Sequence, residues 1–157
     1  MNNFRKIIVC LSVFFTLALL MACDLGSDDP EVFELEGSWL ASGVTLTFDQ
    51  NEMIANLSVI ITGTSFENVT EITSPSYYRS TSKGTIEEFN NSEKWYLGQI
   101  TEAPDNETQV GQYGRTVYTL SSDGLSYTGT SYSIEATRDA AMSSTTVMMS
   151  DIVMVKQ

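Results

Sequence analysis

The feature that most constrains the fold of this chain is an alternation of apolar and polar side chains through residues 44–61. Every second position on both sides of a short polar stretch is apolar: Val44, Leu46, Phe48, Met53, Ala55, Leu57, Val59 and Ile61. Successive side chains of a β-strand point to opposite faces, so the pattern predicts a β-hairpin with one apolar and one polar face. A sheet of this kind is typically antiparallel.

The spacing also predicts how the two arms of this hairpin pair. If residues 49–52 form a four-residue turn, Phe48 opposes Met53, Leu46 opposes Ala55 and Val44 opposes Leu57, all on one face. A second hairpin is predicted around Asp123-Gly124, which is strong turn chemistry. The same closure there opposes Leu120 to Leu125 and Tyr118 to Tyr127.

Other β-branched and aromatic runs predict further strands. They lie at about 63–73, 77–86, 94–101, 116–120, 125–130 and 147–155. The last run is apolar on both faces, so we expect it to pair with a neighbour rather than lie as an exposed edge. Residues 138–144 suit one helical turn or a loop, and no sustained helical periodicity follows residue 23. About eight or nine strands with short turns predict an all-β domain, either a closed barrel or a sandwich.

The first 22 residues have the features of an export signal. Arg5 and Lys6 precede an apolar run that ends at Ala22, and this run is shorter than the about 20 residues of a membrane span. A positive start, an apolar core and a small residue before the cleavage point predict a secretory signal peptide over residues 1–22. The alternatives are a plain signal peptide that is cut near Ala22 and an uncut N-terminal anchor.

Leu20, Ala22 and Cys23 resemble the lipobox of bacterial lipoproteins, with Met21 in place of the usual small residue. The resemblance implies that Cys23 is acylated and becomes the new N-terminus. The protein would then be lipid-anchored in the bacterial cell envelope, facing the periplasm or the cell exterior, with the membrane as a partner through the acyl chains on Cys23. The residues that follow are acidic and interrupted by Pro30, so we expect 23–34 to be a lipidated tether and 35–157 to be the folded domain.

Gly37 and Trp39 resemble the Gly-x-Trp motif that begins lipocalin barrels. The resemblance implies a lipocalin-like, antiparallel up-and-down barrel of about eight strands. In it Gly37 and Trp39 would be structural, with Trp39 closing the base and Arg138 as the candidate for a late Arg that packs on Trp39. Inward side chains nearer the open end would face a ligand: Val44, Leu46, Phe48, Leu57, Tyr118 and Tyr127.

Composition argues against several functions. The chain has no His, and its two Cys are Cys10, in the predicted signal, and Cys23. The domain would therefore lack the commonest general base, the commonest metal ligand and any internal disulfide. It also has no Gly-x-Ser-x-Gly motif. We expect no enzyme activity, no metal and no cofactor. With 20 acidic against 8 basic residues, we expect no nucleic-acid partner.

Two functions stay open at this point. The barrel would either bind a small apolar or amphipathic ligand in its interior, or be filled by its own side chains and display its loops to a protein partner. Eight-stranded barrels of both kinds exist, and the same inward residues would serve either one. Uptake of an apolar probe distinguishes a cavity from a filled barrel.

Overall fold

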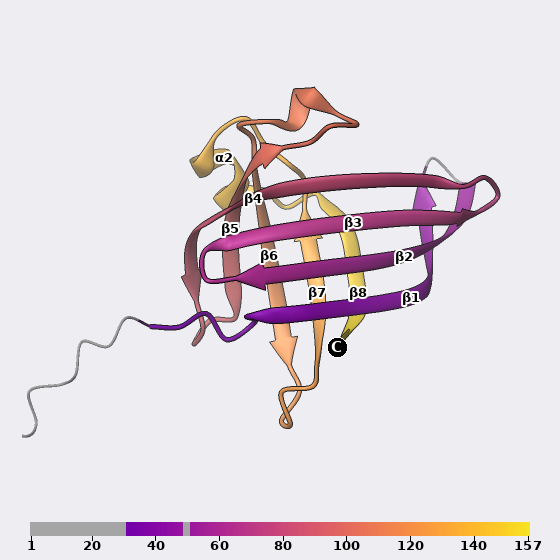
Figure 1. Cartoon of the computed structure of the whole chain (residues 1–157). Coiled ribbons are helices and arrows are strands. Elements are labelled where there is room, and N and C mark those ends of the chain that lie inside the picture. The colour runs from indigo at the N-terminus through magenta and orange to yellow at the C-terminus, as the bar shows by residue number, and fades with distance from the viewer. Residues whose placement is uncertain (1–30, 49–50) are drawn as a thin grey trace, which may run out of the picture. The chain divides into compact units, whose positions relative to one another are not determined.

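The computed structural model describes residues 31–48 and 51–157, in which eight antiparallel strands form a closed barrel (Figure 1). The strands are β1 (Gly37–Phe48), β2 (Asn51–Thr62), β3 (Ser65–Ser74), β4 (Tyr78–Asn90), β5 (Trp95–Glu102), β6 (Tyr113–Leu120), β7 (Ser126–Tyr132) and β8 (Val147–Lys156). Each strand pairs with the next in sequence, and β8 pairs with β1. The predicted all-β, lipocalin-like up-and-down barrel is therefore confirmed. The predicted signal peptide and Cys23 lie outside the described residues.

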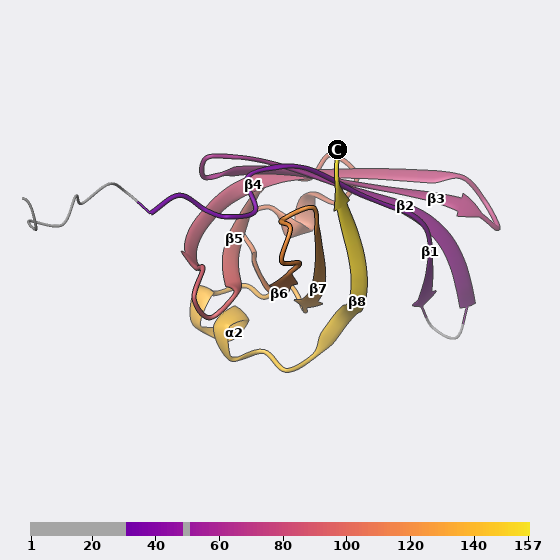
Figure 2. The same ribbon diagram turned by 90° about the horizontal axis from the view of Figure 1, so that it is seen from below.

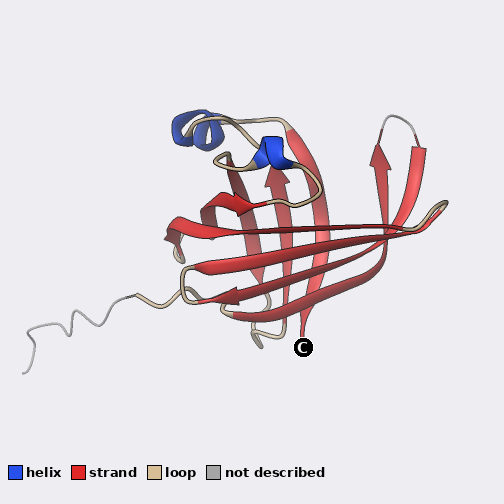
Figure 3. Ribbon diagram, turned by 45° about the horizontal axis from the view of Figure 1, so that its top comes forward, coloured by secondary structure: helices blue, strands red, loops and turns tan. Residues whose placement is uncertain are grey.

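Two short helices accompany the barrel. The 3₁₀ helix η2 spans Glu107–Gln109, and α2 spans Arg138–Ser143, where one helical turn or a loop was predicted. Thr137 caps α2, because its side chain accepts a hydrogen bond from the amide of Ala140. Figure 3 shows both helices at the end of the barrel away from the C terminus. No helix in the described residues is long and apolar enough to cross a membrane.

The two halves of the barrel differ in shape. Strands β1 to β4 extend beyond the barrel as a sheet, whereas β5 to β8 cross them (Figure 1). Of the crossing strands, β5 to β7 are short, with 7 or 8 residues, and β8 has 10 residues, as many as β3. Seen from below, β5 to β8 curve beneath the long strands and enclose the interior (Figure 2). The interior therefore lies between one face of the long sheet and the strands β5 to β8.

The register of the first hairpin differs from the predicted one. Phe48 pairs with Asn51 and Leu46 pairs with Met53, so only residues 49–50 separate the arms. The predicted pairs of Phe48 with Met53, Leu46 with Ala55 and Val44 with Leu57 are wrong by two residues. A shift of two keeps each side chain on its own face, so the alternation alone does not distinguish the two registers.

The second hairpin is also shifted. Tyr118 pairs with Gly129 and Leu120 pairs with Tyr127, so the predicted opposition of Tyr118 to Tyr127 and of Leu120 to Leu125 is wrong. The turn is closed by Ser121 and Ser126 instead of Leu120 and Leu125. The Ser121 amide donates to the Ser126 carbonyl at 2.8 Å, and the Ser126 amide donates to Ser121 Oγ at 3.0 Å. Leu125 therefore belongs to the turn and is exposed.

The N-terminal segment before β1 is part of the barrel. Phe33 and Leu35 are both buried in the core, and the compact unit begins at Val32 rather than at the predicted residue 35. Lys94 Nζ lies 2.7 Å from Glu34 Oε1, and the Asn91 side chain donates to the carbonyl of Val32. These contacts hold the segment against the turn between β4 and β5.

Candidate ligand-binding site

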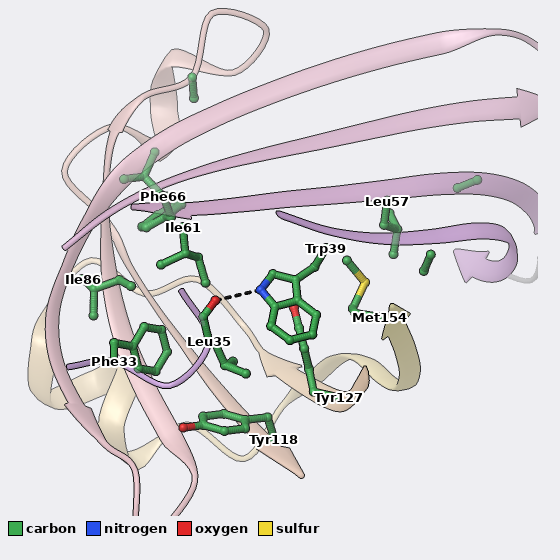
Figure 4. Close-up of a cluster of buried hydrophobic side chains, with 14 residues drawn as sticks. Phe33, Leu35, Trp39, Leu57, Ile61, Phe66, Ile86, Tyr118, Tyr127 and Met154 are labelled. Carbon is green, nitrogen blue, oxygen red and sulfur yellow. Dashed lines mark hydrogen bonds between the residues drawn. The ribbon is translucent and has the colours of Figure 1, made fainter. Parts of the chain in front are cut away.

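The base of the barrel is closed around Trp39. Its indole Nε1 donates a hydrogen bond to the Leu35 carbonyl at 2.7 Å (Figure 4), and its ring meets that of Tyr127 edge-on at 4.9 Å between centroids. The cation over the ring is Lys156, whose Nζ lies 5.3 Å from the ring centroid. The prediction that Arg138 packs on Trp39 is wrong, because Arg138 forms an ion pair with Glu88.

Gly37 leaves room for this cation. Its φ is +133°, a backbone conformation that side-chain-bearing residues rarely adopt, and a Cβ there would lie 3.0 Å from Lys156 Cε. Both residues of the Gly-x-Trp motif thus have a structural role: Trp39 fills the base, and Gly37 leaves space for Lys156, the last residue of β8, to cover Trp39.

Phe33 extends the closure with an aromatic floor. Its ring centroid lies 5.1 Å from that of Phe89, 5.3 Å from that of Tyr96 and 6.2 Å from that of Tyr118. Aromatic pairs at such separations stabilise one another beyond their simple burial. We call Phe33, Leu35, Trp39, Phe89 and Tyr118 the floor. This part of the barrel is filled by its own side chains.

Above the floor, the interior holds a cavity of about 120 Å³, here called the interior cavity. One wall comes from β2 and β3 and includes Leu57, Val59, Asn68 and Thr70. The opposite wall comes from β5 to β8 and includes Tyr96, Thr116, Tyr127, Gly129, Ser131, Met149, Ile152 and Met154. The cavity is therefore lined by both apolar and uncharged polar groups.

The polar groups of the interior cavity are neutral. Thr116 Oγ1 and Ser131 Oγ lie 3.1 Å apart and share a hydrogen bond. Burial raises the pKa of Tyr96, an effect that its hydrogen bond with Thr116 partly offsets. Burial also raises the pKa of Tyr127. Both phenols thus stay protonated at neutral pH, and the cavity can offer hydrogen bonds without a charge.

No protein-family model, curated protein or solved structure matches this chain.

A second cavity, of about 340 Å³, lies between the facing edges of β1 and β8 and is here called the seam cavity. It is lined by Thr45, Leu46, Thr47, Met53, Met148, Met149, Ser150 and Ile152. Met149 and Ile152 line both cavities. The interior cavity and the seam cavity are therefore neighbours that share one wall.

The predicted ligand-facing residues separate into three groups. Leu57 and Tyr127 line the interior cavity, and Leu46 lines the seam cavity. Tyr118 instead lies in the floor, and Val44 packs against the core without lining either cavity. The side chain of Phe48 lies outside the described residues.

The polar lining was missed by sequence reasoning. Asn68, Thr70, Thr116 and Ser131 face inward, but inward polar residues break the apolar–polar alternation on which the prediction depended. Pairing is the signal that finds them. Val59 is opposite Asn68 and Leu57 is opposite Thr70, so each polar residue shares the face of an apolar partner.

Metal ligands do not gather at this site. Within residues 31–48 and 51–157, no group of three or more His, Cys, Asp or Glu side chains is placed to hold a metal ion. Glu88, one of the two adjacent carboxylates of β4, is paired with Arg138 on the outside of the barrel. The side chains that line the two cavities offer apolar surface and uncharged hydrogen-bonding groups.

Proposed function

We propose that this protein binds one small apolar or amphipathic ligand inside its barrel. The observation that carries the proposal is the interior cavity, which lies above a floor that is already filled. Leu57, Tyr127 and Met154 are each less than a tenth exposed there, so a ligand in contact with them would be removed from water. An enclosed apolar cavity of about 150 Å³ takes up a molecule the size of benzene.

We further propose that the protein acts from a membrane, as a lipoprotein of the bacterial cell envelope. Arg5, Lys6 and the apolar run up to Ala22 support export, and the Leu20–Cys23 stretch supports acylation of Cys23. A carrier or sensor held at a membrane would meet apolar molecules where they are concentrated.

A titration of the full chain with Nile red, an uncharged apolar dye, tests ligand binding. We expect saturable one-to-one binding that is lost in Leu57→Trp, because the larger side chain fills the interior cavity. Ile60→Trp is the matched control, since Ile60 lies on the same strand but is exposed on the outer face. Both variants keep the apolar N-terminal run, so a loss of binding in Leu57→Trp alone would assign the binding to the barrel and not to that run.

Two results would contradict the proposal. One is a folded protein that takes up no dye, and the other is a Leu57→Trp protein that keeps its thermal unfolding midpoint and binds the dye as tightly as the parent. Either result would favour the filled-barrel alternative.

One observation supports that second candidate function, a protein-interaction module. Tyr77 and Tyr78 are exposed by 69% and 49% at the tip of the β3–β4 hairpin, and exposed tyrosines are enriched at protein interfaces. If this tip is the contact surface, Tyr77→Ser should abolish crosslinking of the protein to an envelope protein in intact cells and leave Nile red binding unchanged.

A further inference from the structure

We infer that the ligand passes sideways through the seam between β1 and β8, and that this passage selects neutral or cationic amphiphiles over anionic ones such as fatty acids. The inference rests on the proposed function, because it names the class of molecule that the same cavity would take. It adds a route and a charge preference that the interior cavity alone does not specify.

The route follows from the pairing of the two strands. β1 and β8 pair at only two positions, Trp39 with Lys156 and Leu40 with Val155. Beyond these positions the strands run on to Phe48 and Val147 without further mutual pairs among the described residues. The seam cavity occupies this interval. It is therefore a side opening between two neighbouring strands that pair only near the base of the barrel.

A β-bulge connects the opening to the interior. Gly129 pairs with Ile152 and Ser131 pairs with Met149, so β8 has one residue more than β7 over this stretch. Asp151 takes up the extra residue in the left-handed conformation, with φ at +59°. Both Met149 and Ile152 are consequently only partly exposed and line both cavities.

Volume shows why a ligand would occupy both cavities. Pockets for drug-sized ligands hold about 300–1,000 Å³, and the interior cavity, at about 120 Å³, is smaller than this. The seam cavity, at about 340 Å³, lies within the range. A molecule with a single chain could place one end inside and the rest along the seam. Met53, Met148 and Met149 are flexible side chains that adapt to such a chain.

Charge decides which head group fits. No charged side chain of the described residues lines either cavity, and burying a carboxylate without a partner is costly. The charges that adjoin the seam in sequence are acidic and exposed: Glu52 pairs with Thr47, and Asp151 lies between Ser150 and Ile152. An anionic head would be repelled there, whereas a neutral or cationic head would not.

The basic residues of the described chain are engaged elsewhere. Each basic side chain contacts a residue that lines neither cavity. The contacts are Arg79 with Glu71, Lys83 with Glu67 and Glu102, Lys94 with Glu34, Arg115 with the Met142 and Ser144 carbonyls, Arg138 with Glu88, and Lys156 with Trp39. Lys156 is on the β1–β8 seam, but its Nζ lies over the Trp39 ring at the base, and no basic side chain of the described residues lines the seam cavity.

Displacement of Nile red from the full chain at neutral pH tests the charge preference. We expect dodecanol and dodecyltrimethylammonium to displace the dye at concentrations at least tenfold lower than dodecanoate. Asp151→Asn should narrow that gap several-fold by strengthening dodecanoate binding, and dodecanol should be unaffected. Asn is suitable because it tolerates the left-handed conformation as well as Asp does. Equal displacement by dodecanol and dodecanoate would overturn the charge preference.

A pair of neighbouring substitutions on β2 tests the route. Met53 lines the seam cavity but not the interior cavity, whereas Ile54 is exposed on the opposite face. We expect Met53→Glu to weaken dodecanol binding at least tenfold and Ile54→Glu to leave it unchanged. A folded Met53→Glu protein with parental affinity for dodecanol would overturn the route.

Methionine oxidation gives a second measurement on the unaltered chain. Dodecanol should slow peroxide oxidation of Met53 and Met148 several-fold and leave that of Met142, on α2, unchanged. Equal rates with and without dodecanol at all three positions would also overturn the route. The proposed function fails differently: Nile red would then not bind at all, or would bind independently of Leu57.

Discussion

The indole Nε1 of Trp39 lies 2.7 Å from the carbonyl oxygen of Leu35, and both residues are buried at the base of the barrel. This hydrogen bond ties the segment that precedes β1 to the side chain that closes the base. The segment, the floor and the last residues of β8 thus form one packed unit.

Trp39→Ala is expected to lower the free energy of unfolding by about 3–5 kcal/mol, because it leaves a cavity in the core. Trp39→Phe keeps an aromatic ring but removes the donor to the Leu35 carbonyl, which costs about 1–3 kcal/mol. Urea unfolding measures both. Trp95→Phe is the control: its Nε1 bonds to Glu93 at an exposed position, so the change should stay within about 0.5 kcal/mol. Similar losses at Trp39 and Trp95 would contradict the role of Trp39.

Gly84 and Gly98 are expected to tolerate no larger residue, because the Phe66 ring lies directly over them. A Cβ on Gly98 would be 2.7 Å from Phe66 Cε1, and a Cβ on Gly84 would meet both Phe66 and the Gln99 backbone carbonyl. Alanine at either position should destabilise the barrel by about 1–3 kcal/mol or more. Adding Phe66→Leu should rescue Gly98→Ala better than Gly84→Ala. At Gly98 the new Cβ meets only the Phe66 ring, whereas at Gly84 it also meets the Gln99 backbone carbonyl, which Phe66→Leu does not remove.

Gly114→Ala is the matched control for these two glycines. A Cβ there would meet only Ile134 Cγ1, at an ordinary distance of 3.9 Å. Thermal unfolding should show little change for this variant. A loss as large as that of Gly84→Ala would show that strand glycines matter here for a reason other than the Phe66 ring.

Arg115 is expected to stabilise the connection between α2 and β8. Its Nη1 donates to the Met142 carbonyl at 2.7 Å, its Nη2 donates to the Ser144 carbonyl at 3.0 Å, and it stacks on Tyr132. Arg115→Met removes the donors and should cost about 1–3 kcal/mol in urea unfolding. Arg138→Met removes an exposed ion pair with Glu88 and should cost less than about 1 kcal/mol. The reverse order would be inconsistent with these contacts.

Stability is expected to fall at alkaline pH. Burial raises the pKa of Tyr96 and Tyr127 above the ordinary value of 10.0. The folded state therefore holds these protons more tightly than the unfolded state does, and stability declines as the pH rises above about 10. Tyr96→Phe with Tyr127→Phe should flatten this decline in chemical unfolding followed against pH. An unchanged slope would assign the decline to other groups, such as lysines.

Cys23→Ser is expected to release the protein from membranes, because it removes the proposed acylation site. Fractionation of cells by centrifugation measures the result, and Cys10→Ser should leave the protein with the membranes. Membrane association of the Cys23→Ser protein after cleavage of the N-terminal run would disprove acylation at this residue.

The strands were predictable from the sequence because alternation and turn residues are local signals. Residues 147–155, for instance, were expected to pair with a neighbour rather than lie as an exposed edge, and β8 pairs with both β7 and β1. Registers were not predictable, since a shift of two residues preserves every face. In β1, Ala41 pairs with Leu57 and Val44 with Ala55, so β1 has a bulge of one extra residue between them. This bulge and the one at Asp151 were missed for a related reason: one extra residue changes the pairing without changing the composition.

The lining of the candidate site was predictable only for part of its apolar residues. Leu57 and Tyr127 were found from their alternation, but Tyr118 shows the same alternation and lies in the floor. Whether an inward side chain lines the interior cavity or packs in the floor depends on its position along the barrel axis. That position depends on the pairing of all the strands in the sheet. Phe33 was missed because its neighbours Glu31, Glu34 and Glu36 give the segment the composition of a tether.

The short seam also bears on the order in which the chain folds. Closing the barrel brings Trp39 to Lys156, so it joins segments that are far apart in the sequence and has a larger loop-closure entropy than any hairpin. Hairpins such as β2–β3 need only adjacent residues and can form while synthesis or export continues. The floor stays open to water until β8 arrives. If the chain is exported unfolded, its interior is completed only after the last strand has left the translocation channel, and a chain stalled before that point would present its aromatic floor to chaperones and proteases.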